Sequence, residues 1–70
     1  PLTRLLLVDP ELREDDPLVH AIESRGYAVR LPRDGASAEV QIRLWRPHLV
    51  VLELVLPDES GADWLRRCRV

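Results

Sequence analysis

Two acidic segments of this 70-residue chain each follow a short apolar run, and their carboxylates are the main candidates for chemistry. The first apolar run ends at Asp9, Pro10 and Glu11, and the second ends at Glu53. An unbroken apolar run is typical of a strand that is buried on both faces of a parallel sheet. Ligand sites in open α/β sheets form at the carboxyl ends of such strands. We therefore interpret Glu53 as a site candidate, with simple exposure to solvent as the alternative.

Three strands are predicted. Two of them end at these acids, and the other lies between those two in the sequence. The apolar run 5–8 predicts the first strand, which ends at Pro10 because proline has no amide hydrogen to donate to a neighbouring strand. The alternating segment 27–31 predicts an edge strand, and the apolar run 49–52 predicts a buried central strand.

A helix is expected after each strand. The first is predicted to begin with Asp16 as its N-cap and Pro17 in its first position, because a proline further inside would cost ~3 kcal/mol. Gly26 is expected to end this helix. Its apolar stripe is predicted at Leu18, Ala21 and Ile22.

The second helix is predicted to be capped by Asp34 and to end at Arg46 and Pro47. Its apolar stripe is predicted at Ala38, Ile42 and Trp45. A third helix is expected from Ser60, in a capping box with Asp63, to the end of the chain. Its negative end is complemented by Arg66, Arg67 and Arg69.

The predicted order is βαβαβα, and its crossover connections favour right-handed parallel pairing. We expect an α/β fold whose sheet has the strand order 2-1-3. In that order the crevice at the carboxyl edge lies between Asp9 and Glu53, so two acids are predicted to face one pocket.

Composition excludes several function classes. The formal charge of -2 and the absence of any acidic block longer than 14–16 give no reason to expect direct nucleic-acid or membrane binding by this segment. The single cysteine, Cys68, has no disulfide partner, which favours a reducing, cytoplasmic location. No pair of nucleophile and base is visible, and His20 and His48 lie away from the predicted carboxyl edge. We therefore expect no enzyme and no catalytic residue.

Three segments and their mutual spacing resemble a bacterial response-regulator receiver domain: LLLVDPEL, RGYAVRLPRDG and RPHLVVLELVLPDESG. The resemblance covers residues 1–70 and implies the first three βα units of a flavodoxin-like, three-layer fold. The later units of such a domain lie outside this sequence.

The resemblance implies a Mg²⁺ site at an acidic cluster and a phosphoacceptor aspartate after the third strand. These roles fall on Asp9, Pro10, Glu11 and Glu53. Proline supplies no side-chain oxygen to a cation, and Glu53 is one methylene longer than the expected aspartate. We therefore expect no metal or at most weak Mg²⁺ binding, and severely suppressed phosphoryl transfer. The loop beside the site contains two further acids, Asp58 and Glu59. We expect them to be either weak cation ligands or solvated groups.

The hypothesis is an atypical, phosphorylation-independent receiver of a two-component system in which Glu53 is a fixed negative charge or merely tolerated. The implied partner is a histidine kinase or an effector domain, and a DNA-binding segment further along would make the protein a transcription regulator. One alternative is a phosphorylatable receiver with a weak Mg²⁺ site. Another is an assembly module that forms a homodimer through the exposed edge of the third strand, unless later strands cover that edge.

Overall fold

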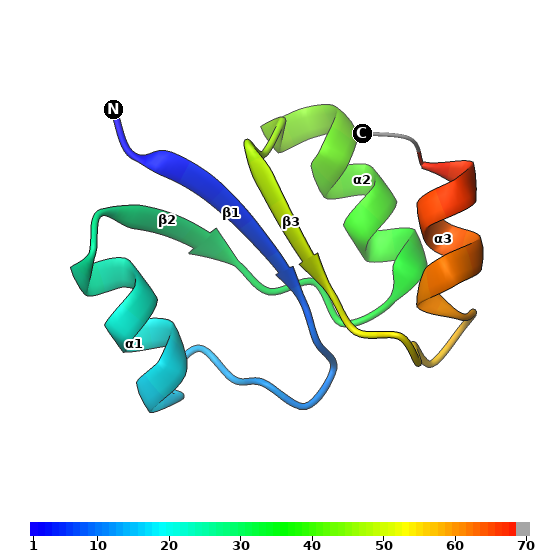
Figure 1. Cartoon of the computed structure of the whole chain (residues 1–70), viewed down its shortest axis with the longest axis horizontal. Coiled ribbons are helices and arrows are strands. Elements are labelled where there is room, and N and C mark those ends of the chain that lie inside the picture. Colours follow the sequence, from blue (N-terminus) through cyan, green and yellow to red (C-terminus); the bar gives the residue numbers. More distant parts are fainter. Residues whose placement is uncertain (69–70) are drawn as a thin grey trace.

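The computed structural model describes residues 1–68 and contains three parallel strands with a helix after each (Figure 1). The elements are β1 (Thr3–Val8), α1 (Pro17–Ser24), β2 (Tyr27–Arg30), α2 (Gly35–Trp45), β3 (Leu49–Leu52) and α3 (Gly61–Arg67). The strand order is β2-β1-β3, and both pairs are parallel. The predicted α/β class, element order and 2-1-3 sheet are confirmed. None of the helices within residues 1–68 is long and apolar enough to cross a membrane.

Helix α1 begins as the sequence predicts but turns a different side to the sheet. The Asp16 carboxylate accepts a hydrogen bond from the Leu18 amide at 2.9 Å, and Pro17 is the first helical residue. The predicted stripe is wrong in part, because Leu18 and Ala21 are exposed while Val19 is buried. With the helix starting at Pro17, Val19 and the half-buried Ile22, three residues apart, face inward.

The ends of the helices follow local capping chemistry. Gly26 ends α1 with a φ of 95°, a left-handed conformation that favours glycine. The Asp34 carboxylate accepts from the Ser37 amide at 2.8 Å at the start of α2. The Ser60 hydroxyl caps α3, which ends at Arg67 rather than continuing to the chain end. The predicted role of Arg69 lies outside the described residues.

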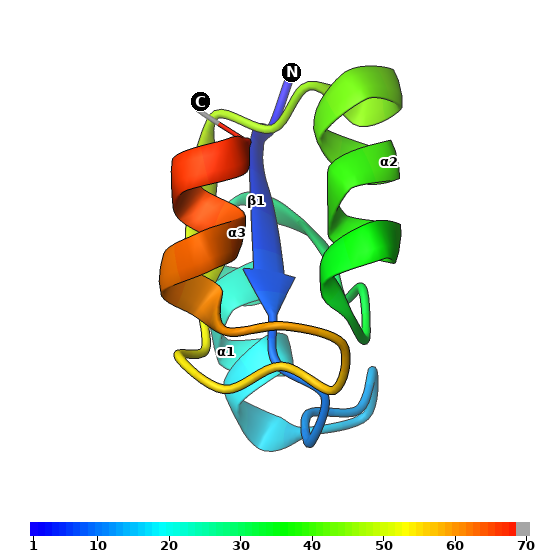
Figure 2. The ribbon, with the colours of Figure 1, turned by 90° about the vertical axis from the view of Figure 1, so that its right-hand side faces the viewer.

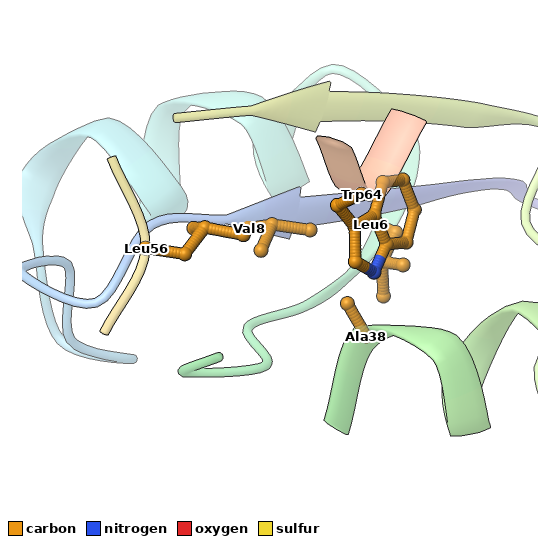
Figure 3. Packing of buried hydrophobic residues seen from close by; sticks show 5 residues of the cluster. All are labelled: Leu6, Val8, Ala38, Leu56 and Trp64. Carbon is orange, nitrogen blue, oxygen red and sulfur yellow. The ribbon is translucent and has the colours of Figure 1, made fainter. Parts of the chain in front are cut away.

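The main core lies between β1 and the helices α2 and α3. Figure 3 shows Trp64 beside Leu6 and Ala38, with Leu56 next to Val8. All five side chains are buried. The half-buried residues that pack against them are Ile42, Trp45, Val50, Leu52 and Cys68.

Strand β3 is covered on one face only, which corrects the prediction that it is buried on both. Val50 and Leu52 pack against the core, whereas Leu49 and Val51, which alternate with them, remain 48% and 51% exposed. Helix α1 packs against β2, at the other edge of the sheet (Figure 1). Within residues 1–68, the β3 side of this face is therefore left open to solvent.

Candidate functional site

The carboxyl edge of the sheet brings the two predicted acids side by side. Val8 pairs with Leu52 in the register of β1 and β3, so the next residues along the two strands are Asp9 and Glu53. The Glu53 amide donates a hydrogen bond to the Val8 carbonyl at 2.9 Å and extends the pairing beyond the strands. A shallow pocket of ≈ 230 Å³ opens at this edge. It is lined by Asp9, Pro10, Glu11, Glu53 and Val55.

The acidic turn after β1 is held by its own backbone. The Asp9 Oδ1 atom accepts a hydrogen bond from the Glu11 amide at 2.9 Å, and the Asp9 carbonyl accepts from Leu12 at 3.3 Å. This Asx turn occupies one oxygen of the Asp9 carboxylate. The Pro10 carbonyl accepts a hydrogen bond from the Arg33 guanidinium at 3.3 Å, which brings a positive charge to the turn.

Glu53 is an exposed residue of the pocket, and hydrogen bonds hold the backbone of the loop in which it lies. Its Oε2 atom accepts a hydrogen bond from the Leu54 amide at 3.2 Å. The Leu54 carbonyl accepts from the Gly61 amide at 2.6 Å, and Val55 and Ser60 form an antiparallel bridge. These contacts close the loop on itself, so the backbone that carries Glu53 is anchored at the start of α3.

The pocket lacks a side-chain oxygen at one position that the resemblance assigns to a Mg²⁺ ligand. Mg²⁺ requires near-octahedral oxygen ligands at ~2.0 to 2.1 Å. Pro10 offers no side-chain oxygen, and Asp9 already uses one oxygen in its turn. Within residues 1–68, no group of three His, Cys, Asp or Glu side chains is arranged to hold a metal ion.

Asp58 and Glu59 belong to the loop beside the pocket, yet neither side chain lines it. The Asp58 carboxylate accepts from the amides of Gly35 at 2.8 Å and Ala36 at 3.0 Å, at the start of α2. Asp58 is therefore a second cap of α2, supplied from a loop 22 residues or more away in sequence. The expectation of a weak cation ligand or a solvated acid did not include this structural role.

Glu59 takes part in an ion-pair network that joins the loop to both helices. Arg67 of α3 contacts Glu59 and, at 2.9 Å, Glu39 of α2. The hydrogen bonds that Arg67 donates to Glu59 and, second in effect, to Glu39 raise the pKa of Arg67. The bond that Glu39 accepts from Arg67 lowers the pKa of Glu39. The local pattern predicted only that Arg67 would complement the end of α3, because the partners of a long-range ion pair are not visible in such a pattern.

Asp58 is expected to make the protein sensitive to acid. The hydrogen bond from the Gly35 amide lowers the pKa of Asp58 below its ordinary value of 3.8. A carboxyl with a lower pKa in the folded state stabilises that state above its unfolded pKa. This contribution is lost as the pH falls through the lower, folded pKa. The Asp58→Asn variant is therefore expected to be less stable than the wild type at pH 6. Between pH 6 and pH 3 it is expected to lose less stability than the wild type loses.

Urea unfolding across this pH range checks the prediction, with Asp15→Asn as the matched control because Asp15 is an exposed acid that precedes α1. The control is expected to retain the acid sensitivity of the wild type. Equal pH dependence of Asp58→Asn and the wild type would contradict the capping role.

Comparisons with known proteins show which class of protein this chain resembles. No protein-family model matches the chain. The chain is 38% identical over 65 residues to the probable transcriptional regulatory protein TcrX of Mycobacterium tuberculosis, which covers 93% of this chain and 28% of that protein. It is 33% identical over 66 residues to the DNA-binding response regulator MtrA of Mycobacterium leprae, with 94% and 29% covered.

A solved structure agrees with these relatives. The crystal structure of the signal receiver domain of a protein described as a Luxo repressor, from Vibrio parahaemolyticus, has a TM-score of 0.75 and 29% sequence identity to this chain. The match covers 96% of this chain and 52% of that one. The resemblance to a receiver domain of the response regulators of two-component systems is therefore confirmed in sequence and in fold. The chain spans less than a third of the two relatives named above and about half of the solved domain.

Proposed function

We propose that this chain is a receiver that signals without phosphorylation and that Glu53 supplies a permanent negative charge at the phosphoacceptor position. The observation that carries the proposal is the place of Glu53, next to Asp9 at the carboxyl edge of adjacent parallel strands. An acid at this point alters the electrostatics of the loop that leads into α3. A constant charge there holds the loop in one state and biases a conformational equilibrium instead of switching it.

The same pocket is poorly suited to accept a phosphoryl group. Phosphoryl transfer depends on in-line geometry and on neutralisation of charge by a metal ion. Pro10 removes a potential metal ligand, and the longer Glu53 side chain places the nucleophilic oxygen in a different position from that of an aspartate. We infer that this segment is not an enzyme and that it acts through a protein partner, either a histidine kinase or an effector domain.

We base the proposed cellular location and the proposed role of the complete protein on the same resemblance to response regulators. We propose a cytoplasmic protein in which this segment contacts proteins and not nucleic acid or membranes. The names of the relatives include transcriptional regulators. Regulation of transcription is accordingly the proposed role of a complete protein that contains this chain.

Restoring the missing chemistry tests the proposal. In the full-length protein, the double variant Pro10→Asp, Glu53→Asp is expected to gain Mg²⁺ binding in calorimetry and Mg²⁺-dependent labelling by acetyl phosphate. The added carboxylate and the shorter acceptor restore the ligand and the geometry together. The single variants are the matched controls and are expected to gain much less. Equal Mg²⁺-dependent labelling of the wild type and the double variant would contradict the proposal.

A second candidate function is assembly through β3, which the exposure of Leu49 and Val51 favours. An apolar strand at a sheet edge attracts another strand. We propose that further polypeptide covers this edge, either from a longer form of the same chain or from a second copy in a homodimer. Leu49→Lys, Val51→Lys is expected to abolish a homodimer at this edge in sedimentation velocity. An unchanged sedimentation coefficient in a dimeric protein would contradict assembly through β3.

A further inference from the structure

Hydrogen bonds join the amino end of β1 to the connection between α2 and β3. The Arg4 guanidinium donates to the Arg46 carbonyl through Nε at 3.0 Å and through Nη2 at 2.7 Å. The Arg4 carbonyl accepts from the His48 amide at 2.8 Å. The Arg4 amide donates to the Nδ1 atom of the His48 ring, also at 2.8 Å. Figure 2 shows this connection beside the amino end of β1, where the chain passes from α2 to β3.

The His48 ring supplies an acceptor that the backbone ladder between β1 and β3 lacks at this point. In a parallel ladder, the residue to which a strand residue donates lies two positions before the residue from which it accepts. Because the Arg4 carbonyl accepts from His48, the regular acceptor for the Arg4 amide is the Arg46 carbonyl. Arg46 ends α2 with a left-handed φ of 53°, and its carbonyl accepts from the Arg4 side chain instead. The ring nitrogen takes the place of that carbonyl.

This hydrogen bond requires a neutral imidazole that carries its proton on Nε2. A neutral ring has one donor and one acceptor nitrogen, whereas a charged ring has two donors. A proton on Nδ1 therefore points an N–H group of His48 at the N–H group of Arg4. Since His48 is exposed, its ring can take up this proton from solvent.

The charged groups of this cluster do not favour a protonated ring. The two charged residues that share the cluster with His48 are Arg4 of β1 and Arg46 at the end of α2, and both are cations. On the other side of Arg4, β2 contributes the uncharged Ala28. Among residues 1–68, no Asp or Glu forms an ion pair with His48. A proton on the ring thus removes a hydrogen bond and gains no anionic partner.

We propose that His48 is a pH-sensitive latch, which joins the start of β3 to β1 while its ring is neutral and releases it when the ring is protonated. Histidine is suited to such a switch because its charge ordinarily changes between about pH 5 and pH 8. On protonation the ring has to turn away from the Arg4 amide. The latch lies at the amino edge of the sheet, opposite the edge that carries Asp9 and Glu53, and is independent of the role proposed for Glu53.

Nitrogen-15 NMR of the full-length protein tests the latch directly. At about pH 8, a scalar coupling across the hydrogen bond is expected between the Arg4 amide nitrogen and His48 Nδ1, with ring nitrogen shifts of the Nε2–H tautomer. At about pH 5 the coupling is expected to disappear as both ring nitrogens become protonated. An Nδ1–H tautomer at the higher pH, or a coupling that persists at the lower pH, would overturn the proposal.

His48→Asn separates the hydrogen bond from the titration. Its amide oxygen lies as many bonds from the backbone as Nδ1 and accepts at every pH in this range. At pH 5 the Arg4 amide is expected to exchange its hydrogen about fivefold faster in the wild type than in His48→Asn, which corresponds to the loss of one hydrogen bond. At pH 8 the two proteins are expected to exchange alike.

Two further variants complete the comparison. His48→Ala has no acceptor and is expected to show fast exchange of the Arg4 amide at both pH values. His20→Asn is the matched control, because His20 is an exposed histidine on α1, and it is expected to follow the wild type throughout. Equal exchange of the wild type and His48→Asn at pH 5 would contradict the latch, and so would a His20→Asn variant that behaves like His48→Asn.

Discussion

Replacing Trp64 with alanine is expected to leave the chain largely unfolded at room temperature. Trp64 is fully buried, packs on Leu6 and Ala38, and donates a hydrogen bond from its indole Nε1 to the Gly35 carbonyl at 2.8 Å. Truncation of a buried tryptophan to alanine costs ~3–5 kcal/mol. A single core in a chain of about 70 residues rarely supplies more than ~3–5 kcal/mol of stability, so the loss removes most or all of it.

Circular dichroism and urea titration of the variants measure this effect. Trp64→Phe retains most of the volume but leaves the Gly35 carbonyl without its indole donor, and a cost of about 1–3 kcal/mol is expected. Trp45→Ala is the matched control, because Trp45 is only half-buried and packs at the margin of the core. A folded Trp64→Ala variant with a midpoint close to that of Trp45→Ala would show that the core does not depend on Trp64.

Gly61→Ala is expected to destabilise the chain and to displace the backbone of Glu53. A Cβ atom on Gly61 would lie 2.3 Å from the Glu53 carbonyl oxygen and 3.0 Å from the Leu54 Cα atom. Both are backbone atoms, so no change of rotamer relieves the clash. The hydrogen bond between the Gly61 amide and the Leu54 carbonyl then has to lengthen. Overpacking of this kind costs roughly 1–3 kcal/mol, and alanine's higher helix propensity offsets only part of it.

Gly26→Ala provides the comparison for this variant. A Cβ atom on Gly26 meets nothing within 4 Å, but the φ of 95° is unfavourable for alanine and costs about 1–2 kcal/mol. Both glycine variants are thus expected to lower the urea midpoint. Only Gly61→Ala is expected to shift the amide NMR signals of Glu53 and Leu54. If these signals stay in place in Gly61→Ala, the close approach between α3 and the loop is not present in solution.

Local patterns in the sequence predicted the elements and their caps because the determining chemistry lies within a few residues. Asp16 and Asp34 each cap the helix that directly follows them, and Gly26 ends the first helix through its own backbone conformation. The parallel neighbours β1 and β3 also follow from the order of the elements. That order places Asp9 and Glu53 at one edge of the sheet.

The features that sequence analysis missed depend on contacts between distant segments. Leu49 and Val51 belong to an unbroken apolar run, and their exposure follows from what covers the sheet rather than from the run itself. Asp58 lies in a polar loop, where nothing in the pattern indicates that its carboxylate caps α2. The inward side of α1 was mispredicted because Leu18 and Val19 are adjacent apolar residues, and packing decides which of them faces the sheet.

Intact-mass spectrometry of the full-length wild-type protein, after incubation with Mg²⁺ and either acetyl phosphate or its cognate kinase, tests the central claim most directly. The expected result is an unchanged mass, since Pro10 supplies no side-chain ligand to a metal ion and glutamate stands at the acceptor position. A stoichiometric mass increase of one phosphoryl group in the wild type, lost in Glu53→Gln, would contradict the claim that Glu53 acts as a permanent charge.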